Sequence, residues 1–203
     1  MNWRFQKLNY DILIPKLDKS IYQLSDEEAA IYFEWFIEKI PERVAYISKV
    51  CAQELGVSEE KMDLSPESLM LLWKWFRRRS KTEPIPRTDS ENAEKKNLNI
   101  NRANKRQLTL ETEYILRDVG MYLGETFRKN YSNIYWTFYT KPSRDFFVNH
   151  PLLKGFVDMT TGKAFEACFE PIHMVHVQAT RIINNTSRDT DLLKLYNIWS
   201  EKT

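Results

Sequence analysis

The sequence predicts an α+β fold, with N-terminal helices, then a helix packed on a small antiparallel sheet, then C-terminal helices. Stretches with helical spacing of apolar residues fill the first part of the chain, and short runs rich in aromatic and β-branched residues come later. We divide the 203 residues into a helical part (1–79), a basic loop or linker (80–104) and an α+β part (105–203). The first and third parts are expected to form one continuous globular unit.

Two helices are expected before Gly56. Ser25 and Glu28 have the spacing of a capping box, and an apolar run with helical character follows them. This pattern ends before Pro41, which can itself occupy the first turn of a second helix over 42–55. Gly56 then stops that helix in the C′ position.

A third helix is expected over 68–79, where the closing Arg77-Arg78-Arg79 suits the negative end of the helix dipole. Trp75 lies off the apolar stripe of this helix, so its ring is expected to be exposed or to contact another element or chain. The segment 80–104 contains few apolar side chains and predicts a long loop or hinge.

The fourth helix contains the most informative segment of the chain. Thr109 is its expected N-cap, and the helical pattern continues to Phe127. Gly120 and Gly124 lie inside this pattern, and a glycine weakens a helix by about 1 kcal/mol relative to alanine. We therefore expect a close approach to the bare backbone at these two positions.

Three strands and two helices complete the expected fold. The turn at 160–163 has chemistry suited to a hairpin, while 172–177 would tolerate either a helix or a strand. The expected elements are strands at 133–139, 155–158 and 164–169, a helix at 171–183, and a last helix that is capped by Asp189 or Thr190 and ends at Trp199.

Composition and charge favour a cytoplasmic protein with no membrane segment, because no run approaches the roughly 20 apolar residues that span a bilayer. Two cysteines give no disulfide framework.

The net charge of +2 is unevenly distributed. Residues 1–66 hold 8 Lys or Arg against 12 Asp or Glu, whereas residues 77–106 hold 10 against 4. We expect this basic block to be a solvated segment. Nucleic-acid binding through 77–106 is the alternative, because Trp73–Arg79 combines aromatic and cationic residues.

Three residues near the end of the expected sheet offer a metal site. His173 and His176 share a helical face, and Cys168 lies just upstream. The spacing is not a standard zinc signature and no fourth ligand is apparent, so buried or partner-facing histidines are favoured and no cofactor is expected. A metal-dependent enzyme that uses His173 and His176 is the alternative.

The carboxylates of the fourth helix do not form an acid–base pair. Glu113 and Glu125 are about 18 Å apart along the helix, so solvated or capping roles are favoured for them and for Asp118. Glu125, between Gly124 and Thr126, is the one expected to face a partner. No nucleophile elbow or phosphate loop is present, which weakens the case for an enzyme.

The segment Val119-Gly120-Met121-Tyr122-Leu123-Gly124-Glu125, followed by Tyr135-Trp136, resembles a pattern in small uncharacterised bacterial proteins of the polymorphic-toxin immunity type. In those proteins a helix with a Gly-Tyr-Leu-Gly-Glu-like segment packs on a sheet strand that carries a tryptophan. The resemblance covers residues 109–170, about a third of the chain. It implies a cytoplasmic binding protein rather than an enzyme.

The expected partner is therefore another protein, with a toxin as one candidate. Acidic residues of the N-terminal part could complement a basic active site on such a partner. The candidate partner-binding residues are Glu125, Trp75, Tyr122 and Trp136.

Overall fold

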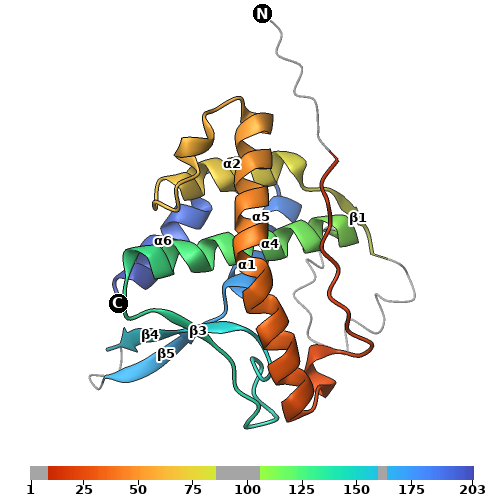
Figure 1. Cartoon of the computed structure of the whole chain (residues 1–203). Helices are drawn as coiled ribbons and strands as arrows, with labels where there is room; N and C mark the ends of the chain where they lie inside the picture. Colours follow the sequence, from red (N-terminus) through yellow and green to blue (C-terminus); the bar gives the residue numbers. More distant parts are fainter. Residues whose placement is uncertain (1–8, 86–105, 160–163) are drawn as a thin grey trace, which may run out of the picture.

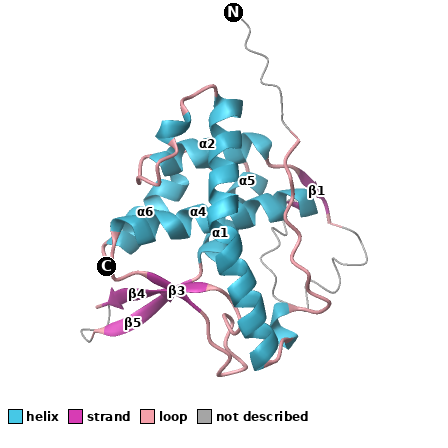
Figure 2. Ribbon diagram, in the orientation of Figure 1, coloured by secondary structure: helices cyan, strands magenta, loops and turns pink. Residues whose placement is uncertain are grey.

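The computed structural model describes residues 9–85, 106–159 and 164–203. The α+β class is confirmed (Figures 1 and 2). The described helices are α1 (Asp26–Leu55), α2 (Ser68–Arg79), α4 (Leu110–Asn130), α5 (Pro171–Ile183) and α6 (Asp191–Ser200), with the short 3-10 helices η1 (Ile21–Gln23) and η2 (Glu59–Lys61). The described strands are β1 (Thr82–Pro84), β2 (Arg106–Leu108), β3 (Tyr135–Thr137), β4 (Leu152–Asp158) and β5 (Phe165–Phe169).

Helix α4 is the centre of the molecule. It contacts α1, α2, α5 and α6, and each residue of 115–124 is buried. Figure 1 shows α1 in front of α4, with the sheet of β3, β4 and β5 below it. The main hydrophobic cluster includes residues from both the N-terminal helices and the α+β part, so the two parts share one core.

The expected sheet is present as three antiparallel strands in the order β3-β4-β5. The predicted pairing of the last two strands is confirmed, while the turn at 160–163 lies outside the described residues. Strands β1 and β2 form a separate antiparallel pair that the sequence did not predict. Three-residue strands are too short to show a period, and β1 lies in the segment expected to be a loop. The remainder of that segment, 86–104, lies outside the described residues.

Helix α1 is one continuous helix, so the predicted break at Pro41 is wrong. Its N-terminus is as expected, because the Ser25 side chain accepts a hydrogen bond from the Glu28 backbone N–H. A proline inside a helix costs about 3 kcal/mol or more. Phe36 and Ile47 are fully buried on either side of it, so burial of one long apolar face outweighs that cost.

The two glycines of α4 allow close packing, as predicted. A Cβ atom on Gly124 would lie 2.2 Å from Cζ2 of Trp136 on β3, and one on Gly120 would lie 2.9 Å from Cα of Ile172 on α5. Both distances are below normal contact, so neither position accepts a side chain without a shift of its neighbour. Gly124 therefore allows α4 to pack closely on the sheet, and Gly120 allows it to pack closely on α5.

The expectation that Trp75 is exposed is wrong, although the alternative that it contacts another element is confirmed. Its ring is 1% exposed, and its indole Nε1–H donates to Glu54 Oε2 of α1 at 2.7 Å. Helix α2 packs against α1, α4 and α6 at once, which buries residues on most of its sides. The apolar stripe in the sequence of one helix does not show that three other helices pack against it.

The C-terminal part follows the prediction with one change. Residues 172–177 are helical, within α5. Thr190 occupies the N-cap position of α6 without a side-chain hydrogen bond there. Asp191 instead accepts from the Arg188 backbone N–H at 2.7 Å. Among the residues that the structure describes, no helix has both the length and the apolar character needed to cross a membrane.

Candidate functional site

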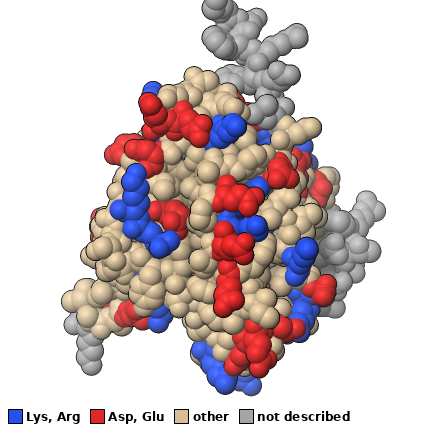
Figure 3. All heavy atoms as spheres, in the orientation of Figure 1, with Lys and Arg blue, Asp and Glu red and all other residues tan. Residues whose placement is uncertain are grey.

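A row of exposed glutamates runs along the outer side of α1. Glu34, Glu38 and Glu42 are four residues apart and therefore lie on one side of the helix, and Glu27 continues the line toward the N-terminus. We call these four residues the acidic row. Figure 3 shows acidic side chains gathered along α1 in the centre of the view.

The charges of the acidic row are poorly compensated. Lys39 Nζ lies 3.4 Å from Glu42 Oε2, but among the described residues no cation forms an ion pair with Glu34 or Glu38. Like charges four residues apart weaken a helix by about 0.2–0.5 kcal/mol per pair. The row therefore lowers the stability of α1 slightly while it creates a negative surface that attracts cations.

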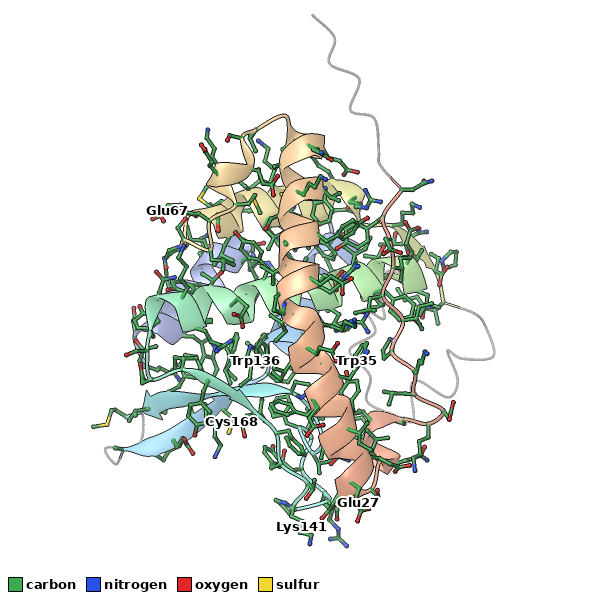
Figure 4. The ribbon with its side chains drawn as sticks, in the orientation of Figure 1. Glu27, Trp35, Glu67, Trp136, Lys141 and Cys168 are labelled. Atoms are coloured by element: carbon green, nitrogen blue, oxygen red, sulfur yellow. The ribbon has the colours of Figure 1, made fainter. Side chains whose placement is uncertain are left out.

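A pocket of about 280 Å³ opens beside the N-terminal end of this row. Its apolar walls are Leu17 and Leu24 of the N-terminal segment and Ile31, Tyr32 and Trp35 of α1. Ile31 is 66% exposed and lies within the acidic row, between its first two glutamates. The pocket and the acidic row thus form one continuous surface. Figure 4 shows Trp35 and Trp136 on opposite sides of α1, with Trp35 toward the N-terminal segment.

A buried polar network fixes the N-terminal segment that forms one wall of the pocket. Asp118 Oδ2 on α4 accepts from the Tyr10 hydroxyl at 2.7 Å and from Arg43 Nη2 at 2.6 Å. Arg43 Nη2 also donates to the Asp11 backbone oxygen at 2.6 Å. Burial raises the pKa of Asp118, and the hydrogen bonds from Arg43 and Tyr10 oppose that rise. The prediction that Asp118 is solvated or caps the helix is wrong, because it is 1% exposed at mid-helix.

Two further contacts hold the same segment. Arg117 donates to the Leu13 backbone oxygen, and its guanidinium lies 5.9 Å from the centre of the Trp35 ring. The Asn149 side-chain amide donates to the backbone oxygen of Leu24 at 3.2 Å. Both walls of the pocket are therefore tied to the core, and the pocket is preformed.

The sequence-predicted residues around the two glycines lie elsewhere. Trp136 Nε1–H donates to Glu125 Oε1 at 2.7 Å, so these two meet as one pair. Tyr122 is fully buried, and its hydroxyl donates to Ser68 Oγ at 2.8 Å. Trp75 is buried at another contact, and the Trp136 ring is 9% exposed. The three aromatic rings thus belong to the core, and only the Glu125 side chain, 20% exposed, has appreciable surface.

The histidine alternative lacks a common centre. His176 Nε2 lies 3.2 Å from Glu113 Oε1, and this hydrogen bond raises the pKa of His176. His173 packs edge-on against Phe146, and burial lowers the pKa of His173. Cys168 is a half-buried free thiol on β5. Within the described ranges, no three or more His, Cys, Asp or Glu side chains are placed to hold a metal ion together.

Part of the basic charge of α2 is used inside the fold. Arg77 forms an ion pair with Asp189, and Arg79 forms one with Glu54. Residues 86–105 of the basic block lie outside the described residues. Nucleic-acid binding through 77–106 therefore stays a prediction that the described side chains do not strengthen.

Comparisons of the chain with models of protein families, with curated proteins and with solved structures give no significant match. The acidic row and its pocket were not predicted. The spacing of Glu34, Glu38 and Glu42 is visible in the sequence and could have indicated the row. The pocket has no such signal, because its walls come from two segments that meet only in the fold.

Proposed function

We propose that the protein is a non-catalytic, cytoplasmic protein-binding protein that engages a basic partner through the acidic row. One observation carries this proposal: exposed glutamates repeat at four-residue spacing along α1 with little compensation by cations. Such a row favours encounter with a positively charged surface and raises the association rate. Solubility alone does not require charges of one sign on one line.

Immunity to a bacterial toxin is the form of this role that the resemblance at residues 119–125 and 135–136 implies. Many enzymes that act on anionic substrates carry basic active sites, and a rigid acidic helix can cover such a site. Blocking requires no chemistry from the bound protein. It requires complementary charge and a surface held firmly enough to limit the entropy lost on binding.

The test compares how much partner protein is captured by the wild type and by variants with altered charge on one surface. Tagged protein is mixed with lysate of the source organism, and bound proteins are quantified by mass spectrometry. The double variant Glu34→Lys/Glu38→Lys reverses two charges of the acidic row. Glu59→Lys/Glu201→Lys, at two exposed positions on η2 and after α6, makes the same charge change and is the matched control.

We expect the wild type and the control to retain the same protein at near-equal molar amounts. The row variant should retain at least tenfold less, which corresponds to about 1.4 kcal/mol or more of binding free energy. Equal retention by the row variant, or no stoichiometric protein in any sample, would contradict the proposal.

A further inference from the structure

We infer that the pocket between the N-terminal segment and α1 receives one large aromatic side chain from a cationic segment of the partner. This inference rests on the proposed function and adds the chemistry of the partner. It is carried by three features of the pocket: its size, its polar groups and the charge beside it.

The size of the pocket suits a side chain. Its volume of about 280 Å³ lies just below the roughly 300–1,000 Å³ typical of sites for small molecules and cofactors. Protein interfaces commonly bury an aromatic anchor in a pocket of this kind, surrounded by polar contacts. The Tyr32 and Trp35 rings stack at 5.6 Å between centres, and together they give the pocket an aromatic wall.

Two polar groups in this wall form no hydrogen bond with the described residues. They are the Trp35 indole N–H and the Tyr32 hydroxyl, and both atoms reach the solvent. Burial raises the pKa of Tyr32 to about 12, and a tyrosine hydroxyl is protonated and can donate at neutral pH even at its ordinary pKa of about 10. Tyrosine and tryptophan usually find a hydrogen-bond partner when buried, and a docked segment can supply backbone carbonyls to both.

The charge beside the pocket sets the flanking chemistry. The charged residues that line the pocket are Lys16, Asp18, Lys19 and Glu28, whose formal charges sum to zero, and Lys19 Nζ is 2.7 Å from Glu28 Oε2. Beyond the rim, the exposed charges nearest to Ile31 on the helix are Glu27 and Glu34, one on each side. A side chain inserted past Ile31 would therefore place its neighbours against carboxylates, which favours lysine or arginine on both sides of the anchor.

The test uses three short peptides as probes and NMR titration of the full chain. The first peptide is Lys-Lys-Trp-Lys-Lys, the second has alanine in place of the tryptophan, and the third has glutamates in place of the lysines. Ile31→Glu is the decisive variant, because it removes an apolar wall of the pocket and adds negative charge. Ile198→Glu makes the same change at a 59% exposed position on α6 and is the matched control.

We expect the wild type and Ile198→Glu to bind the tryptophan peptide about tenfold more tightly than the alanine peptide. In Ile31→Glu this ratio should fall to about one, although the added charge by itself favours cationic peptides. The acidic peptide should bind least. An equal affinity for the first two peptides in the wild type, a ratio unchanged in Ile31→Glu, or tight binding of the acidic peptide would overturn the inference.

The variant Glu34→Lys/Glu38→Lys separates this inference from the proposed function. If this variant binds both cationic peptides more weakly than the wild type does, but the wild type binds the tryptophan and alanine peptides equally, the pocket inference fails and the acidic row remains a binding surface. If it changes neither affinity, the role of the row fails as well.

Discussion

Helices α4 and α1 differ in how much of their surface the fold buries. Helix α4 carries the segment that stands out in the sequence, and residues 115–124 are all buried, with the Tyr122 hydroxyl bonded to Ser68 and one Asp118 carboxylate oxygen bonded to Arg43. Helix α1 looks ordinary in sequence, yet one side packs in the core while the other exposes the acidic row and the pocket. Unusual residues inside a helix therefore mark packing here, and the surface available for binding lies on the plainer helix.

The largest expected effect tests the buried side. Arg43→Ala leaves the Asp118 carboxylate buried without its cation, and breaking a buried pair in this way typically costs about 3–5 kcal/mol. Urea denaturation should show this loss in the free energy of unfolding. Lys39→Ala, on the outward side of the same helix, should change it by less than about 0.5 kcal/mol. Similar small losses of unfolding free energy in both variants would contradict the contrast between the buried and outward sides of α1.

A smaller loss is expected at the helix–sheet contact. Gly124→Leu forces a side chain into the space of the Trp136 ring, and overpacking typically costs about 1–3 kcal/mol. The melting temperature should fall. In the Trp136→Ala background the same substitution should cost less, because the obstructing ring is gone. An unchanged melting temperature in the wild-type background would count against the close approach.

The pH dependence of stability tests the pair between α5 and α4. The pKa of His176 is raised by Glu113, so the pair stabilises the fold below the ordinary histidine pKa of 6.5. This stabilisation is lost as the pH rises through the folded-state pKa. The His176 side chain is 41% exposed, and solvent screening limits the effect to less than about 1 kcal/mol. The stability difference between wild type and Glu113→Gln should be larger at pH 5.5 than at pH 8. A larger difference at pH 8 would reverse the assigned sign.

The smallest effect is expected on the open side. In Glu34→Lys/Glu38→Lys the repulsion along the acidic row is relieved, so the free energy of unfolding should stay the same or rise by a few tenths of a kcal/mol. Thermal unfolding followed by circular dichroism measures this. A loss above about 1 kcal/mol would mean that these carboxylates are structural, and the capture experiment would then need variants at other positions of the row.

The sequence predicted those features that depend on neighbours along the chain. The capping box at Ser25 and Glu28, the start of α4 at Thr109 and the demand for bare backbone at Gly124 are local signals. The continuity of α1 through Pro41 and the burial of Trp75 depend on how many helices pack against one element, which no local pattern encodes.

The site divides in the same way. The four-residue spacing of the acidic row is a local pattern, and only its exposure had to come from the structure. The pocket depends on contacts between residues far apart in sequence, such as Tyr10 with Asp118 and Asn149 with Leu24. Contacts of this kind leave no signal in a single sequence.

The measurement that tests the central claim most directly is the association rate constant with the captured partner at 20 and 200 mM NaCl. If the acidic row steers a basic partner, the wild-type rate should fall at least about tenfold at the higher salt concentration. Glu34→Lys/Glu38→Lys should associate slowly at both concentrations. Rates that respond to neither salt nor the variant would contradict the assignment of α1 as the binding surface.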